Sequence, residues 1–256
     1  MAKINIEKAV NRTKLIYLFA KSWCLCYTTS MIFSIFEYNL SLGEMTILLL
    51  GITLIFMLSL SLHEWAHGFV AYKQGDPTPK ITGRLTLNPL SHIDAYGFIM
   101  FLCIGVGWAK PMPVNPNNFK KYRSGIAKVS IAGVIVNLIL CIVGSFLYVL
   151  TRNQLGDGDL LVILLELFMW VNAFLVVFNL IPVYPLDGFN FVSSFMRSNN
   201  KFVQWNIRNA GKVFLWVIIA DLFIELFTGI SIIGYLLSTL AGWICNPLCK
   251  LWQLMF

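Results

Sequence analysis

Two histidines and a glutamate lie close together at residues 63–67, where the sequence reads His-Glu-Trp-Ala-His. On an α-helix, positions i and i+4 share one face, so His63 and His67 can direct two imidazoles at a single ion. Glu64 directly follows His63, and its carboxylate can act as a general base toward water at that ion. This spacing is typical of zinc hydrolases, and it predicts metal-assisted hydrolysis.

The histidine pair follows an apolar segment, because residues 45–62 carry no charge. A helical histidine pair can also be structural. Ionisable groups are costly to bury in lipid, however, and those found there are functional by default, which favours the metal interpretation.

The composition predicts an all-α polytopic membrane protein. Of the 256 residues, 58% are hydrophobic and 12% are charged, whereas about 45–50% of a soluble domain is apolar. The net charge of +7 comes from short basic segments between apolar stretches. Short basic segments of this kind are typical of the loops that orient a membrane protein in the bilayer, and no nucleic-acid partner is indicated. The six cysteines lack the paired spacing of a zinc ribbon, and we interpret them as small hydrophobic residues.

Six apolar segments are candidate spans, judged against the roughly 20 residues needed to cross a bilayer. They comprise residues 15–36, 45–71, 129–150, 160–182, 213–227 and 230–244. Lys and Arg concentrate after the second and fourth segments, so those loops and both termini are expected in the cytoplasm. Asp221 and Glu225 lie in the fifth segment, and we interpret them as buried hydrogen-bonding groups rather than as an ion-coupling site.

The connection 73–128 is more than a simple linker. Residues 81–87 alternate between apolar and polar side chains, which predicts a strand of a small β-hairpin. Residues 97–108 are apolar but too short to span, and three prolines follow, so we expect a re-entrant or interfacial segment.

A catalytic zinc commonly has three protein ligands and one open position, so a third ligand is expected elsewhere in the chain. Asp187 is the best candidate, because it follows the fourth apolar segment where Pro182 and Pro185 interrupt the helix. The second and fourth segments end on the same side of the membrane. We therefore predict that His63, His67 and Asp187 meet at one depth.

Two motifs together, residues 63–67 and Asn179-x-x-Pro-x-x-Pro-Leu-Asp-Gly188, resemble the site-2 protease family of intramembrane zinc metalloproteases. The likeness covers most of residues 45–197, including stretches 83–94 and 107–111 and the Ala132-Gly133 pair with Asn137. It is to the compact form of the family, without a PDZ or CBS domain. It implies one membrane domain over residues 1–256 with a three-helix catalytic core at about 45–197.

The resemblance also implies the chemistry. His63, His67 and Asp187 would bind one Zn²⁺, and Glu64 would be the general base for cleaving peptide bonds in or near transmembrane segments of other membrane proteins, as in regulated intramembrane proteolysis. Asn179 would donate a hydrogen bond to the substrate backbone or to the developing oxyanion. A helical substrate must unwind or add as a strand, for which the hairpin at 81–87 would offer an edge. The expected location is a prokaryotic cell membrane.

Two other functions are less consistent with the sequence. A catalytically silent protein that binds helical substrates would be favoured if Glu64 or a ligand were missing, but all are present. A metal or proton transporter would need ligands along the whole path across the bilayer, and the three histidines lie near one end. His92, in a loop beside Asp94, is interpreted as a structural or substrate-contacting residue and is left out of the metal set.

Overall fold

The structure is a computed structural model that describes residues 42–104, 107–157, 159–197 and 199–255. Among these residues, four helices are long and apolar enough to cross a membrane. They are α3 (Leu42–Gln74), α6 (Tyr122–Leu155), α7 (Leu160–Asn179) and α11 (Ile232–Gln253). They correspond to the predicted spans 45–71, 129–150, 160–182 and 230–244, so the all-helical membrane class is confirmed with four candidate spans. The predicted span 15–36 lies outside the described residues.

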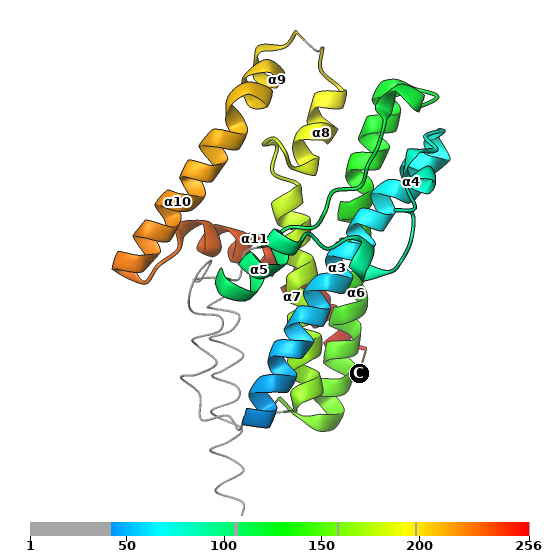
Figure 1. Ribbon diagram of the computed structural model, residues 1–256. Helices are drawn as coiled ribbons and strands as arrows, with labels where there is room; N and C mark the ends of the chain where they lie inside the picture. The colour runs from blue at the N-terminus through cyan, green and yellow to red at the C-terminus, as the bar shows by residue number, and fades with distance from the viewer. Residues whose placement is uncertain (1–41, 105–106, 158, 198, 256) are drawn as a thin grey trace, which may run out of the picture.

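The remaining elements are short, apart from α10. They are α4 (Thr78–Ile81), η1 (Pro89–Ser91), α5 (Ala95–Ile104), η2 (Pro116–Asn118), α8 (Asp187–Ser194), α9 (Lys201–Trp205), η3 (Asn206–Ala210) and α10 (Gly211–Thr228). In Figure 1, α9 and α10 continue one another as an arm beside the other helices. The predicted span 213–227 forms α10, which is not among the four candidate spans.

Helices α3, α6 and α7 lie side by side (Figure 1) and pack closely through small and polar residues. A Cβ placed on Gly51 of α3 would lie 2.4 Å from the Leu164 Cδ2 of α7, so a side chain there would force Leu164 to move. The Asn172 Nδ2 donates to the Ser59 Oγ at 3.0 Å, and both residues are fully buried. Polar groups that meet inside an apolar bundle in this way join α7 to α3.

The outer face of α3 carries a stripe of exposed leucines. Leu50, Leu54 and Leu58 follow one another at four-residue intervals, with 59%, 56% and 45% of their surface exposed. In water such a stripe would be unfavourable, whereas in a bilayer it is the ordinary lipid-facing surface of a spanning helix.

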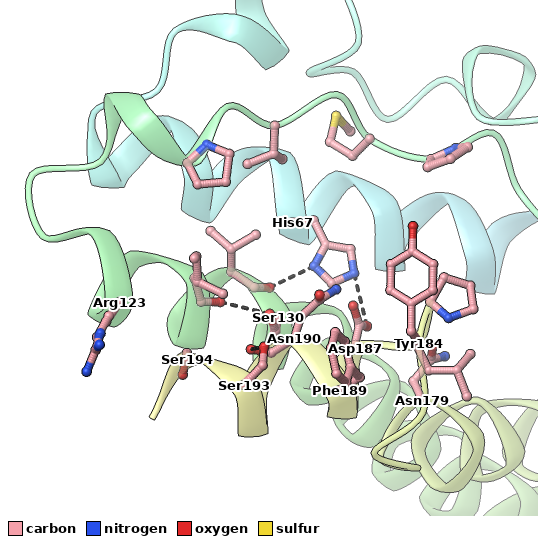
Figure 2. A pocket seen from close by; sticks show the side chains of 18 of the residues that line it. His67, Arg123, Ser130, Asn179, Tyr184, Asp187, Phe189, Asn190, Ser193 and Ser194 are labelled. Carbon is pink, nitrogen blue, oxygen red and sulfur yellow. Dashed lines mark hydrogen bonds and ion pairs between the residues drawn. The ribbon is translucent and has the colours of Figure 1, made fainter. Parts of the chain in front are cut away.

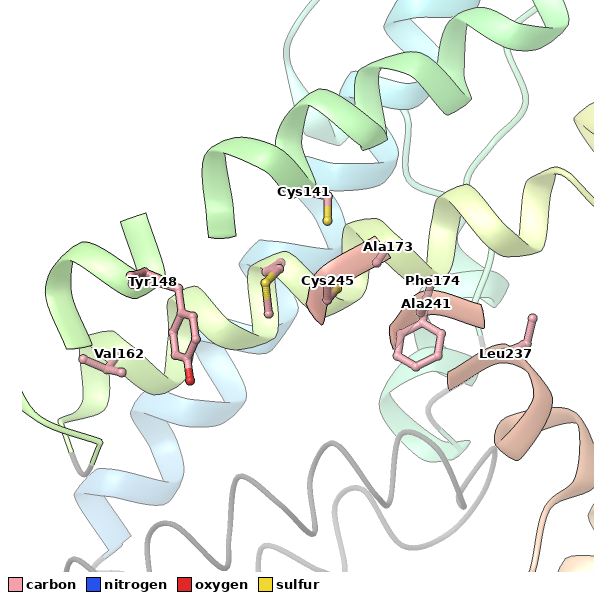
Figure 3. Packing of buried hydrophobic residues seen from close by; sticks show 10 residues of the cluster. Cys141, Tyr148, Val162, Ala173, Phe174, Leu237, Ala241 and Cys245 are labelled. Atoms are coloured by element: carbon pink, nitrogen blue, oxygen red, sulfur yellow. The ribbon is translucent and has the colours of Figure 1, made fainter. Parts of the chain in front are cut away.

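Helix α11 packs against α6 and α7 through a cluster that includes several small residues (Figure 3). Cys141, Ala173, Ala241 and Cys245 are all fully buried in it. Cys141, Cys245 and Cys249 are free, and the first two fill this apolar cluster. The interpretation as small hydrophobic residues is confirmed for Cys141 and Cys245.

The turn between α10 and α11 explains why the Asp221 side chain is buried. Its carboxylate accepts hydrogen bonds from the Ser231 Oγ at 2.6 Å and from the amides of Ile232 and Ile233 at 2.8 and 3.1 Å. These amides begin α11 and have no acceptor within the helix, so Asp221 caps it. The prediction of a buried hydrogen-bonding role is confirmed for this residue.

The predicted β-hairpin at residues 81–87 is wrong. Ile81 ends α4, and the amides of Arg84 and Leu85 both donate to the Pro79 carbonyl at 3.0 Å, so they are not free to pair with a strand. Gly83 takes a positive φ of 67° within this turn. The alternation of residue types arises from a turn with exposed apolar side chains rather than from a pleated sheet.

The apolar segment that follows forms α5, a helix of 10 residues that is too short to cross a bilayer. Its Phe101 stacks on Phe56 of α3, with ring centroids 3.9 Å apart. Beyond it, an isolated antiparallel bridge joins Ile93 to Ala109, and this returns the chain toward α3. The predicted short, non-spanning segment is therefore present as a helix docked on α3.

Candidate metal centre

Three predicted site residues, His63, His67 and Asp187, meet at one point between α3 and the start of α8. Figure 2 shows His67 directed at Asp187. The Nε2 atoms of His63 and His67 are 3.0 Å apart, and each lies 3.2 Å from the Asp187 Oδ2. The three side chains are 6%, 10% and 16% exposed. Three metal-ligating groups are thus held together away from bulk solvent, and the predicted meeting of the three residues is present.

This triangle suits zinc. Ligand atoms about 2.0–2.1 Å from a tetrahedral Zn²⁺ lie about 3.3 Å from one another, close to the observed separations of 3.0–3.2 Å. The Asp187 Oδ2 is buried and has no hydrogen-bond donor in the described part of the chain, so it is an unsatisfied acceptor directed at this point. Two imidazoles and a carboxylate are a common ligand set of catalytic zinc. The residues fit one Zn²⁺.

Helix α6 sets the orientation of both imidazoles. The His63 Nδ1 lies 3.1 Å from the Asn137 Oδ1, and the His67 Nδ1 lies 2.7 Å from the Val129 carbonyl oxygen. Both partners accept hydrogen bonds, so each Nδ1 carries the proton and each Nε2 keeps its lone pair for a metal. The same bonds fix the rotation of the rings.

A glycine lets α6 approach this closely. A Cβ at Gly133 would lie 2.5 Å from the His63 Cε1 and 2.6 Å from the His67 Nε2. Both distances are far below van der Waals contact, so any larger residue at Gly133 would displace the imidazoles.

The chain between α7 and α8 delivers the third group. Helix α7 ends at Asn179, and the prolines that follow prevent its continuation. Asp187 is then the first residue of α8, next to Gly188, whose hydrogen faces the Leu180 carbonyl where a Cβ would clash. The Asp187 Oδ2 thus lies 3.2 Å from the Nε2 atom of each imidazole, where it can act as a metal ligand.

Glu64 lines the same cavity and is held by the backbone of the loop opposite. Its Oε2 accepts a hydrogen bond of 2.6 Å from the Met112 amide. The cavity has a volume of about 860 Å³ and contains His63, His67 and Asp187 in its wall. This volume lies within the range of about 300–1,000 Å³ that small-ligand sites occupy. A carboxylate, a metal site and space for a substrate segment thus adjoin one another.

Two further sequence predictions concern Asn179 and His92. Asn179 lines the cavity, but its Nδ2 donates to the Leu175 carbonyl of its own helix at 3.0 Å, so its role toward an oxyanion stays a prediction. His92 is buried, lies 2.8 Å through its Nε2 from the Thr86 carbonyl, and is not part of the metal group. Its exclusion from the metal set agrees with this placement.

Sequence reasoning assigned no role to Asn137, Gly133 or the Met112 amide. An asparagine in an otherwise apolar span is a signal of a functional or interhelical contact, and Asn137 could have been found that way. A backbone amide leaves no such signal, because every residue other than proline carries one.

Three curated proteins are similar to this chain. The protein named "Putative zinc metalloprotease YwhC" of Bacillus subtilis (strain 168) is 46% identical over 149 residues, which cover 56% of this chain and 67% of that protein. "Putative zinc metalloprotease Rip2" of Mycolicibacterium smegmatis is 30% identical over 141 residues, covering 52% of each chain. The protein of the same name from Mycobacterium tuberculosis is 28% identical over 174 residues, covering 63% of each.

No family model and no solved structure matches the chain. The match to YwhC combines 46% identity with coverage of 67% of that protein, and the geometry of His63, His67 and Asp187 agrees with the metal in that name. The chain therefore belongs to the zinc metalloprotease family that includes YwhC.

Proposed function

We propose that this chain is an intramembrane protease of the site-2 type, which hydrolyses peptide bonds within or next to transmembrane segments of other membrane proteins. The observation that carries this proposal is the position of the metal centre. Its two histidines lie on α3, itself a candidate membrane span, and its aspartate begins α8 just beyond a second candidate span, α7. A hydrolytic site placed there meets substrates at the membrane.

His63, His67 and Asp187 would hold the zinc ion. When bound, zinc supplies a Lewis acid that polarises a carbonyl and lowers the pKa of water toward about 7. Glu64 then accepts a proton at its carboxylate and returns it to the leaving amine. The Met112 amide, bonded to the Oε2, keeps the plane of that carboxylate fixed during the transfer.

The substrate must reach this centre in an unwound form, because a helix hides its peptide carbonyls in internal hydrogen bonds. The loop beside Glu64 contributes Pro111, Met112 and Val114 to the cavity wall. The two prolines at 111 and 113 have no amide hydrogen, and that of Met112 is bonded to Glu64, so residues 111–113 present only carbonyl oxygens. Residues 81–87 form no strand, so this segment offers no edge to which a substrate strand could add.

The direct test is to co-express the chain, as wild type and as Glu64→Gln, with a panel of tagged single-span membrane proteins. Cleavage sites are then mapped by mass spectrometry, and zinc is measured on the purified chains. We expect cuts within or beside the membrane segment for wild type only, with one zinc per chain in both. Glu64→Gln should lower cleavage by at least about 100-fold, which is typical for the loss of a general base.

The outcomes separate the alternatives. Zinc at one ion per chain without cleavage of any panel member would favour a protein that binds membrane segments without cutting them. Absence of zinc from the wild-type chain would contradict the metalloprotease assignment itself.

A further inference from the structure

The loop 109–121 joins the metal centre to a second polar cluster. At one point the Met112 amide reaches the Glu64 Oε2. Further along, the Asn115 amide donates to the Asp76 Oδ2 at 2.7 Å and the Asn118 Nδ2 donates to the Asp76 Oδ1 at 2.8 Å. The loop is therefore tied both to the proposed general base and to a carboxylate just beyond α3.

Asp76 is fully buried, which is unusual for an aspartate in a turn. Its oxygens accept four hydrogen bonds, two from the loop and two from the amide and hydroxyl of Thr78, at 3.1 and 2.6 Å. No Lys or Arg in the described ranges forms an ion pair with it. A buried carboxylate without a cation is tolerated only when hydrogen bonds replace its hydration, and here two of the four come from the loop.

The end of α3 fixes where Asp76 lies. The Gly75 amide bonds to the Tyr72 carbonyl at 3.1 Å, and the Asp76 amide bonds to the Ala71 carbonyl at 3.0 Å. This pattern is a Schellman motif, with Gly75 at a positive φ of 109°. Asp76 is thus rigidly attached to the helix that also carries Glu64.

The loop is stiff enough for its attachment at Asp76 to affect the position of Met112. Pro111 and Pro113 restrict the backbone on both sides of Met112. The loop is also fastened at each end, where the Arg84 Nη2 donates to the Lys110 carbonyl at 2.7 Å and the Lys120 amide donates to the Gln74 carbonyl at 3.0 Å. A stiff segment held in this way moves as a unit when one attachment is lost.

We propose that Asp76 is a positioning residue for the reaction: it fastens loop 109–121 to the end of α3 and so keeps the Met112 amide on Glu64. This inference rests on the proposed function. Asp76 is remote from the metal group and acts through the loop. Losing it should impair the proton transfer by Glu64 while leaving zinc binding intact.

The test uses the full chain in detergent, with fluorescein-labelled casein as a flexible probe substrate. Asp76→Asn replaces one carboxylate oxygen by an NH₂ group that faces an N–H or O–H donor. Asn118→Ala removes a bond on the loop side, and Thr78→Ala, the matched control, removes a bond to the same carboxylate on the other side. The readouts are kcat, KM, zinc content, and hydrogen–deuterium exchange of peptides covering residues 109–121.

We expect Asp76→Asn to lower kcat by about 10- to 100-fold, because a displacement of about 1 Å at a reacting group costs up to about 100-fold. KM should change by less than about threefold, zinc should stay at one per chain, and exchange at 109–121 should rise. Asn118→Ala should change kcat in the same direction, and Thr78→Ala should leave it near wild type.

An unchanged kcat in Asp76→Asn, in a wild-type enzyme that cleaves, would overturn the positioning role. So would an equal loss in Thr78→Ala and Asn118→Ala, since Asp76 would then support only the local turn. Loss of zinc in Asp76→Asn would also overturn it. A wild-type chain that binds zinc but cleaves neither casein nor any membrane substrate would instead overturn the proposed function, and the inference with it.

Discussion

The approach of α6 to the metal centre makes Gly133→Ala the most informative substitution. Carbon atoms are in comfortable contact at about 3.5 Å or more, whereas the new Cβ would lie 2.5 Å from the His63 Cε1 and 2.6 Å from the His67 Nε2. Each imidazole would have to retreat by about 1 Å, and zinc bonds tolerate only about 0.2 Å. Changes that merely misorient a ligand cost about 10- to 100-fold in metal affinity, so we expect a loss of at least about 100-fold here.

The same change should leave the fold largely intact. Alanine favours a helix over glycine by about 1 kcal/mol, and overpacking costs about 1–3 kcal/mol. The net loss in the free energy of unfolding of the zinc-free chain is therefore at most about 2 kcal/mol. The assay is competition for Zn²⁺ with a chromophoric chelator in detergent, alongside thermal unfolding. Gly211→Ala is the control, because its added Cβ meets no atom of another element within 4 Å in the described part of the chain. If Gly133→Ala bound zinc as tightly as wild type, the close contact between α6 and the histidines would be refuted.

Three further outcomes are expected. Asn137→Ala removes the acceptor from the His63 Nδ1 and should weaken zinc binding by about 10- to 100-fold in the chelator assay; unchanged affinity would count against this orienting role. Asp221→Ala removes three hydrogen bonds at the start of α11 and should lower the free energy of unfolding by about 1–3 kcal/mol, seen in thermal melts, with zinc affinity unchanged. Burial opposes ionisation of Asp76, yet its hydrogen bonds lower its pKa below the ordinary value. The carboxyl of Asp76 therefore binds a proton more readily in the unfolded state. The stabilisation that the ionised Asp76 gives the folded protein is complete above about pH 4 and is lost as the pH falls through the pKa of Asp76 in the folded state. Melts of wild type should show a steeper loss of stability below about pH 4 than melts of Asp76→Asn, and equal slopes would contradict this.

The juxtaposition of His63, His67 and Asp187 was predictable because two independent patterns agreed. Helical periodicity placed the two histidines on one face, and the distribution of Lys and Arg placed the ends of two apolar segments on the same side. Neither pattern depends on how the helices rotate about their axes.

Contacts that depend on helix rotation were not predictable. The sequence displays Gly133 and Asn137 within an apolar span, but only the packing of α6 on α3 decides that both face the histidines. The turn at 81–87 was misread because alternation along a few residues does not show whether a partner strand exists. Asp76, which follows a glycine after a helix, has the sequence context of an exposed loop, and its burial depends on donors about 40 residues away.

The division of the metal centre among three segments has a consequence for biosynthesis. The histidines come with α3, the groups that orient them come with α6, and the carboxylate arrives only after α7. A nascent chain that has not yet produced α8 can offer the ion only two of its ligands, without the geometry that tight binding needs. Capture of zinc therefore requires the completed core, and a half-made or truncated copy lacks the metal that hydrolysis needs.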